Sequence, residues 1–483
     1  MNFVIPDFAP AIPEMVLLAL TSFILVADTF WAKRSQFATY YATQIALVVV
    51  AVLILMSFST TQIITFDGSF VRDSFADILK LFVLVISIGI FVFSKEYLLQ
   101  HKFFSGEFFV LGLFGVLGMF VMISSYNFIT LYLGLEIMSL SMYAMVAMRK
   151  DSGAAVEAGM KYFVLGALAT GMLLYGFSMI YGATGEIGFA QVSEVISSGN
   201  ADGVVLAFGV VFIVIGLAFK LGAVPFHMWM PDVYQGAPTA VTLYLGTAPK
   251  IAGFAIVYRL LAEALPGLVE EWQSLIIMLS ILSMVLGSIA AIVQDNLKRM
   301  LAYSGIGHIG FLLLGVIAAT PDGYSASMFY VIVYAITGLA GFGMIVALSR
   351  TGNEFDRVVD FKGLNARNPW LAVMMLIVMF SMAGIPPFIG FWAKIIVIEE
   401  VIKAGFTWIA VVAVITAVIS AYYYLRVVKA MYFDEPEDNT KIEPVSGSLN
   451  WTVSFVALSL LVLGLMPSSL INLCYQSINS LAL

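Results

Sequence analysis

Long apolar stretches separated by short polar segments dominate this chain. A helix needs about 20 mostly apolar residues to cross the hydrocarbon core of a bilayer, and fourteen stretches of membrane length follow one another along the sequence. They cover residues 12–32, 40–58, 75–93, 106–124, 127–147, 155–181, 203–230, 237–262, 274–293, 299–318, 324–349, 370–402, 407–433 and 449–475. The pattern predicts an all-α integral membrane protein with about fourteen transmembrane helices.

Two of these stretches are too long for one straight helix, and prolines interrupt both. The interruptions read GAVPF at residues 222–226 and GIPPF at residues 384–388, and a tryptophan follows each one, Trp229 or Trp392. Backbone that is not helical is tolerated at membrane depth only where it lines a cavity or is buried in protein. Two broken helices with a shared motif are typical of transporters with internal repeats, whereas two unrelated proline kinks are the plainer alternative.

The second motif begins 162 residues after the first, which predicts two related units of five helices each. We expect the first unit over residues 104–262 and the second over residues 274–433. Because five is an odd number, the two units would cross the membrane in opposite directions. Three N-terminal helices (1–100) and a C-terminal helix (434–483) complete the predicted organisation.

Composition and charge agree with a membrane location and exclude other classes. The chain is 61% hydrophobic and 11% charged with a mean hydropathy of +1.00, whereas soluble domains are roughly 25% charged. The net charge of −7 is spread over the loops without a basic run, which argues against nucleic-acid binding. One cysteine, Cys474, and three histidines cannot build an intrachain disulfide, an iron–sulfur cluster or a two-haem site, so we expect no redox centre in this chain.

Basic residues predict the orientation, because lysine and arginine in short loops mark the cytoplasmic side. They fall in every second loop: Lys33, Arg34, Lys95, Lys102, Arg149, Lys150, Lys298, Arg299, Arg350, Arg357, Lys362, Arg367, Lys429 and Lys441. Those loops are predicted to be cytoplasmic, and both termini periplasmic. The first apolar stretch lacks the basic region of a secretory signal, so we expect it to remain as a span.

Charged residues inside the apolar stretches are candidates for function. Glu136 stands alone near the middle of its stretch, where a charge costs about 2.5–3.5 kcal/mol on insertion scales. Lys220, Lys250 and Lys394 also lie at depth and have no partner nearby in sequence. A proton or ion path is one interpretation and a set of structural ion pairs is the other. A path requires accessible neutral lysine, which burial favours and a nearby carboxylate opposes.

Three further polar residues allow two interpretations each. Lys161 has Glu157 one helical turn earlier, so it is either part of a path or a local ion pair at the membrane surface. His227 follows the first broken helix and is either a proton relay or a cap. His308 lies in the tenth apolar stretch and is more ambiguous still.

Two motifs carry a family resemblance. LGLEIMSL at residues 133–140, and Lys220 followed by PFHMWMPDVYQGAP at residues 225–238, resemble the antiporter-like subunits of proton-pumping NADH:quinone oxidoreductase, respiratory complex I. Within that family the chain resembles the subunit N type, because Lys250 stands in APKI where larger relatives have histidine. Lys394 in place of glutamate argues against the M type, and the lack of a long C-terminal lateral helix argues against the L type.

The resemblance implies a half-channel in each five-helix unit, joined by a central hydrophilic axis. By motif match, Glu136 and Lys220 would interact, Lys250 would connect the units, and Lys394 would be the lysine of the second unit. Lys161 and His227 also fall on positions that the family uses. The two break-associated lysines are not strict repeat equivalents, since one precedes its prolines and the other follows them.

The implied function is proton translocation by a non-redox subunit of a bacterial inner-membrane complex. FMN and iron–sulfur clusters would belong to partner subunits, NADH and quinone would be substrates of the complex, and subunits M and K would be neighbours in the lipid bilayer. Two alternatives stay open: a stand-alone or Mrp-type cation/proton antiporter, and a purely structural or quinone-binding membrane subunit. The first would exchange ions without an NADH partner, and the second would tolerate loss of the buried charges.

Overall fold

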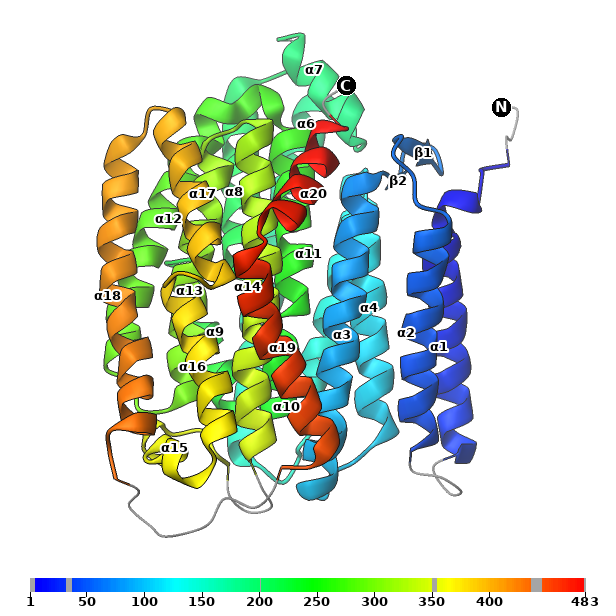
Figure 1. Cartoon of the computed structure of the whole chain (residues 1–483). Coiled ribbons are helices and arrows are strands. Elements are labelled where there is room, and N and C mark those ends of the chain that lie inside the picture. Colours follow the sequence, from blue (N-terminus) through cyan, green and yellow to red (C-terminus); the bar gives the residue numbers. More distant parts are fainter. Residues whose placement is uncertain (1–4, 32–36, 200, 350–353, 436–444, 482–483) are drawn as a thin grey trace.

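The computed structural model describes residues 5–31, 37–199, 201–349, 354–435 and 445–481. The helices run side by side and together form one layer, which is about one helix length thick (Figure 1). In these residues thirteen helices are long and apolar enough to span a membrane. The remaining predicted stretch, 370–402, forms two helices of 15 residues each, α16 (Pro369–Ala383) and α17 (Ile389–Lys403). The predicted fold class, an all-α membrane protein with about fourteen spans, is confirmed.

The N-terminal part consists of three long helices and a small hairpin. Its elements are α1 (Ile12–Trp31), α2 (Ala38–Met56), β1 (Ile63–Thr65), β2 (Phe70–Arg72) and α3 (Ser74–Gln100). The antiparallel hairpin lies outside the apolar stretches, at the end of the layer where α3 begins (Figure 1).

The next part of the chain contains the first broken helix. Its elements are α4 (Gly106–Ile123), α5 (Phe128–Val146), α6 (Gly153–Thr184), α7 (Phe189–Ser197), α8 (Gly203–Leu221), α9 (Trp229–Gly236), α10 (Thr239–Leu245), α11 (Ala248–Val257) and a π-helical segment (Tyr258–Ala264). The predicted single helix at 237–262 is therefore interrupted at Gly246 and Thr247, which places Lys250 in the first turn of α11.

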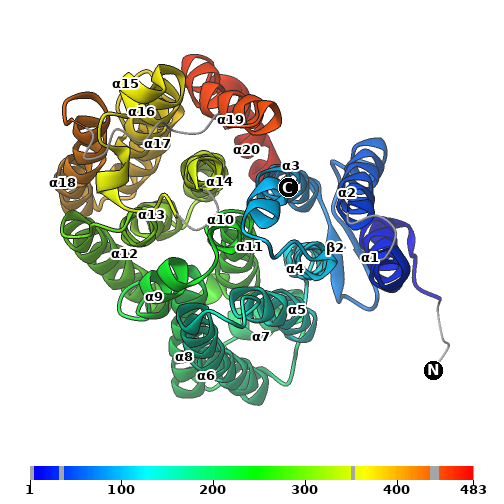
Figure 2. The same ribbon diagram turned by 90° about the horizontal axis from the view of Figure 1, so that it is seen from below.

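The last part contains the second broken helix. Besides α16 and α17, its elements are α12 (Val269–Ile292), α13 (Leu297–Ile317), α14 (Pro321–Leu348), α15 (Leu364–Arg367), α18 (Thr407–Tyr432), α19 (Gly447–Leu465) and α20 (Ser468–Asn479). α14 stands in the centre of a ring of these helices (Figure 2), and nearly all of its residues are buried.

Short polar side chains fix where many of the helices begin. Each accepts a hydrogen bond from a backbone N–H of the first turn, which satisfies a donor that has no partner inside the helix. These caps are Asp73, Ser105, Asn127, Ser152, Asp202, Asn296, Thr320, Asn368 and Ser446.

The backbone turns in the same way at the breaks of the two broken helices, but the two helices run in opposite directions. Gly222 ends α8 at φ +84° and Gly384 ends α16 at φ +83°, a left-handed conformation that favours glycine. A cis proline follows three residues later in each, Pro225 and Pro387. α8 leads downward into α9 in Figure 1, whereas α16 leads upward into α17.

The two faces of the layer differ in their loops. α15 and the ends of α3 and α18 that carry Lys95 and Lys429 lie at the lower face in Figure 1, which we call the basic-loop face. The hairpin, α7 and the described parts of both termini lie at the opposite face (Figure 1). Four basic residues of the predicted pattern, Lys33, Arg34, Arg350 and Lys441, lie outside the described residues.

Candidate functional site

Lys220 on α8 and Glu136 on α5 are linked through Ser139 and not by direct contact. The Lys220 ammonium donates a hydrogen bond to Ser139 Oγ at 3.1 Å, and Ser139 lies one turn after Glu136 on α5. Among the described residues, no carboxylate lies within 4.0 Å of this ammonium. Glu136 nevertheless lies close enough to interact electrostatically with Lys220.

Lys250 binds the carbonyl end of α8. Its ammonium donates to the carbonyl oxygen of Leu221 at 3.0 Å and lies 5.6 Å from the centre of the Trp229 ring. The last carbonyl groups of a helix carry a partial negative charge, so this helix end stabilises the ammonium. The side chain is 3% exposed, and it therefore depends on these contacts in place of water.

Both lysines line one small cavity, which we call the lysine chamber. Its volume is about 20 Å³, and its wall includes Lys220, Lys250, Tyr162, Trp229 and Leu245. A cavity of about 10–15 Å³ holds one water molecule. The chamber therefore has room for one water molecule beside the two lysines.

Lys394 binds the carbonyl end of the second broken helix. Its ammonium donates to the carbonyl oxygens of Met382 at 3.0 Å and Ala383 at 2.9 Å. The Phe311 ring centre lies 5.3 Å away. The lysine reaches back from α17 to the end of α16, so a single broken helix supplies both the cation and its binding oxygens.

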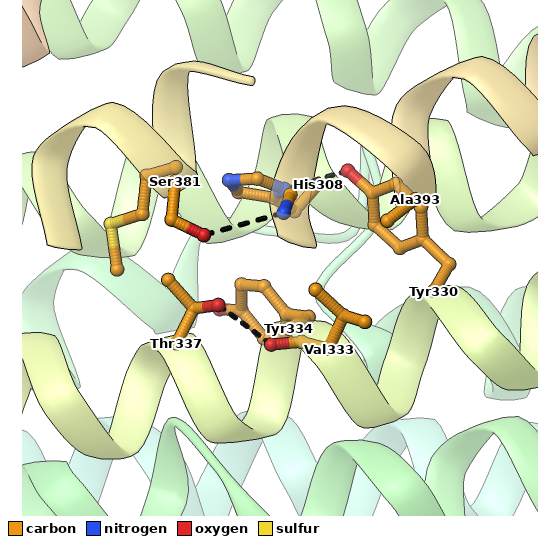
Figure 3. A pocket seen from close by; sticks show the side chains of 9 residues that line it. His308, Tyr330, Val333, Tyr334, Thr337, Ser381 and Ala393 are labelled. Carbon is orange, nitrogen blue, oxygen red and sulfur yellow. Dashed lines mark hydrogen bonds between the residues drawn. The ribbon is translucent and has the colours of Figure 1, made fainter. Parts of the chain in front are cut away.

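Tyr330 lies beside His308, near the second broken helix (Figure 3). His308 Nδ1 lies 2.7 Å from the Tyr330 hydroxyl, and Nε2 lies 3.1 Å from the Tyr424 hydroxyl. Tyr424 also shares a hydrogen bond with Ser304. Sequence reasoning missed the two tyrosines, because an aromatic residue in an apolar helix indicates packing unless its hydroxyl partner is known.

Lys161 lies in an open polar cavity at the basic-loop face, which we call the vestibule. It forms ion pairs with Asp232 at 2.8 Å and Glu157 at 2.9 Å, and Arg299 binds Asp232 at 2.7 Å. The vestibule has a volume of about 320 Å³, and Asp356 also lines it. Lys161 is therefore a partly exposed member of an ion-pair network, unlike the other three lysines.

His227 lies between α8 and α9 and is half-buried. Its Nδ1 atom is buried and has no hydrogen-bond partner within the described part of the chain. The structure thus brings Glu136, Lys220 and Lys250 to one region, places Lys161 in the vestibule below it, and leaves Lys394 at the other broken helix.

Several buried ion pairs near α3 were not predicted. Arg259 pairs with Asp73 at 2.8 Å and with Glu263 at 2.6 Å. Lys80 pairs with Glu14, and both side chains are buried. Because carboxylates hold these cations directly, their arrangement differs from that of the lysines at the broken helices.

A carboxylate network joins helices near the basic-loop face. Tyr97 and Thr239 donate hydrogen bonds to Glu354, and Thr239 does so at 2.9 Å. Burial raises the pKa of Glu354, but the positive charge of Lys298 and the Tyr97 hydrogen bond hold this pKa below its usual range. The ionised carboxylate therefore ties α3 and α10 together.

The residues described contain no group of three or more His, Cys, Asp or Glu side chains arranged to hold a metal ion. The buried lysine, tyrosine and carboxylate side chains and the partly buried His308 are of the types that can hold and transfer protons.

Comparison with known proteins gives consistent matches. The family model described as "NADH:quinone oxidoreductase/Mrp antiporter, TM" matches residues 125–420. A protein of Hydrogenovibrio crunogenus named NADH-quinone oxidoreductase subunit N is 76% identical over 478 residues, which cover 99% of this chain and 100% of that protein. A protein of the same name from Thiobacillus denitrificans is 51% identical, with 98% of each chain covered.

The fold also matches a solved structure. A chain of respiratory complex I from Thermus thermophilus superposes with a TM-score of 0.81 at 30% identity. The match covers 94% of this chain and 98% of that chain.

Proposed function

Because this chain belongs to the family of NADH:quinone oxidoreductase and Mrp antiporter membrane subunits, we propose that it moves protons across the bacterial inner membrane as an N-type subunit of NADH-quinone oxidoreductase. The proposed carriers are Glu136, Lys220, Lys250 and Lys394, with Lys161 at the entrance and His227 beside the first break.

One observation supports this proposal above the others. The ammonium groups of Lys220, Lys250 and Lys394 are each bound by a neutral hydroxyl or carbonyl oxygen. A carboxylate partner at contact distance would favour the charged lysine strongly, whereas a neutral oxygen does so less. These lysines can therefore change protonation state during a transport cycle.

The proposed route starts at the vestibule, where water reaches Lys161 and Asp232. It continues through the lysine chamber and past His308 and Tyr330 to Lys394. The two predicted units, 104–262 and 274–433, would each contribute one half-channel.

The energy must come from outside the chain. Moving one charge against about 100 mV takes about 2.3 kcal/mol, and we propose that this chain carries no redox centre. Electron transfer between NADH and quinone, in partner subunits with FMN and iron–sulfur clusters, would supply it. Subunits M and K are the proposed membrane neighbours.

The proposed carriers can be tested by substitution in the assembled complex. We expect Lys220→Ala, Lys220→Arg and Glu136→Gln to reduce proton uptake and NADH:quinone turnover by roughly tenfold or more, equivalent to about 1.4 kcal/mol. The arginine variant should fail because arginine stays protonated. Assembly should persist, since alanine fits a helix and removes a costly buried charge.

Lys403→Ala is the matched control. Lys403 ends α17, is partly exposed and pairs with Glu399 and Glu400, so its loss should leave turnover unchanged. Wild-type proton uptake in all three test variants would show that Lys220 and Glu136 are structural. Purification in mild detergent separates the antiporter alternative, which predicts cation exchange without co-purifying NADH oxidation.

We also propose that the basic-loop face is cytoplasmic and that both termini are periplasmic. A reporter active only in the periplasm should be active when fused after Leu483 and inactive when fused after Lys150. The reverse result would contradict this orientation.

A further inference from the structure

The vestibule and the lysine chamber lie one helical turn apart on two facing helices. On α6, Ala158 lines the vestibule and Tyr162 lines the chamber. On α9, Asp232 lines the vestibule and Trp229 lines the chamber. Residues three or four apart lie one turn from each other on the same face of a helix. The boundary between the two cavities therefore lies at Tyr162 and Trp229.

At this boundary the two rings stack on each other. Their centres are 4.6 Å apart, and the ring planes differ by 14°. Tyr162 is 8% exposed and Trp229 is 3% exposed. Parallel rings in contact leave no space for a water molecule between them.

The two rings differ in how firmly they are held. Trp229 Nε1 donates to the Phe219 carbonyl at 3.0 Å, and the ammonium of Lys250, a residue that lines the chamber, lies over the same indole. Within the residues that the structure describes, the Tyr162 hydroxyl has one hydrogen-bond partner, Met142 Sδ at 3.8 Å, and a thioether sulfur is a weak acceptor. Trp229 is therefore held by stronger polar contacts than Tyr162, and a movement of Tyr162 breaks only a weak hydrogen bond.

We propose that the Tyr162–Trp229 pair is the barrier that controls the entry of water, and with it protons, from the vestibule into the lysine chamber. The existence of the barrier depends only on the geometry of the two cavities. Its role in proton transport rests on the proposed function. Both residues act by position, since neither ring needs to carry the proton.

Cysteine accessibility in the assembled complex tests the barrier without measuring transport. The native Cys474 is buried in α20 and gives little background. Leu245→Cys places a thiol in the chamber, and Ala154→Cys places one in the vestibule. The probe is a membrane-impermeant trimethylammonium methanethiosulfonate added at the basic-loop face. We expect Ala154→Cys to react at least about ten times faster than Leu245→Cys.

Removing either ring should open the chamber. Adding Trp229→Ala or Tyr162→Ala to Leu245→Cys should bring its reaction rate to within a few-fold of Ala154→Cys. Trp229→Phe keeps a ring and should leave the chamber slow. Phe177→Ala is the matched control, because Phe177 on α6 stacks on Phe128 at 4.6 Å and 20° but lines a different, apolar cavity.

Two results would overturn the barrier. One is equal reaction of Leu245→Cys and Ala154→Cys with both rings present, which needs no ring variant to assemble. The other is slow reaction of Leu245→Cys after loss of the ring in whichever of the two alanine variants assembles. A failure of the proposed function would show instead as normal proton uptake in Lys220→Ala, and it would leave these reaction rates unchanged.

Discussion

At both broken helices a lysine ammonium binds the carbonyl oxygen of the residue before the turning glycine. The oxygen belongs to Leu221 at the first break and to Ala383 at the second. At the first break the lysine comes from another helix, since Lys250 lies on α11. At the second break Lys394 comes from the following half of the same broken helix.

This difference changes what each break can respond to. The carbonyl end of a half-helix carries partial negative charge at membrane depth and attracts a cation whatever its source. A shift of α11 relative to α8 alters the contact of Lys250, whereas the contact of Lys394 is internal to α16 and α17. At the first break the helix's own lysine, Lys220, instead donates a hydrogen bond to Ser139 on α5. The first break is thus coupled to two neighbouring helices.

The largest expected effect is a loss of proton uptake when the lysine at each break is replaced by a residue that can still bind the carbonyl oxygens but cannot transfer a proton. Lys250→Gln and Lys394→Gln keep a hydrogen-bond donor near the carbonyl oxygens but lose the titratable group. We expect normal assembly and a decrease of roughly tenfold or more in proton uptake and turnover for both variants, which is about 1.4 kcal/mol. Turnover and proton uptake by the purified complex measure this effect.

Alanine variants at the same positions complete this test. Lys250→Ala and Lys394→Ala leave buried carbonyl oxygens without their partner, and such a loss costs about 1–3 kcal/mol of stability. We expect Lys394→Ala to be the less stable of the two, because two carbonyl oxygens lose a donor there and one does so in Lys250→Ala. Wild-type turnover in the glutamine variants would show that both lysines serve only to cap the half-helices.

A smaller effect is expected when the turning glycines are replaced. Gly222→Ala and Gly384→Ala should each cost about 1–2 kcal/mol, because both glycines have a left-handed backbone. The new Cβ at Gly384 would lie 2.9 Å from Cδ of Lys394, whereas at Gly222 it would lie 2.7 Å from the Met230 sulfur. Methionine adapts easily, but a displaced Lys394 loses its carbonyl contacts.

We therefore expect similar losses of thermal stability in the two glycine variants and a several-fold loss of turnover in Gly384→Ala alone. Thermal unfolding of the purified complex and NADH:quinone rates provide the two measurements. Equal losses of turnover would indicate that backbone strain, and not the position of Lys394, determines the outcome.

Much of the fold could be predicted because the bilayer imposes a simple length rule on apolar stretches. The resemblance to antiporter-like subunits is likewise confirmed by the comparisons. The breaks at Gly246 and Met466 were missed, although Pro249 and Pro467 follow them closely, because both interruptions are short and lie inside longer apolar stretches. The hairpin at Ile63–Arg72 was missed because it lies outside the apolar stretches.

The candidate site could be predicted only in part. The cost of a buried charge identified Lys220, Lys250 and Lys394, and the same signal at Lys80 was overlooked. The partners of these lysines were beyond sequence reasoning, because every residue carries a carbonyl group and packing decides which one is met. Asp232 lies 71 residues from Lys161, so their ion pair depends on how α6 and α9 pack.

The smallest expected effect concerns the aromatic ring over each lysine. Indole attracts a cation more strongly than phenyl does, and such contacts contribute about 0.5–2 kcal/mol. In the part of the chain that the structure describes, Lys250 has the indole of Trp229 as its aromatic contact and Lys394 has the phenyl of Phe311. We expect Phe311→Leu to reduce turnover by roughly two- to fivefold, about 0.4–1 kcal/mol. Phe329→Leu in α14 is the control, because this buried phenylalanine has no such contact with a cation among the described residues. Equal losses of turnover in the two variants would assign the effect to packing, and the comparison between the breaks would then rest on their carbonyl oxygens alone.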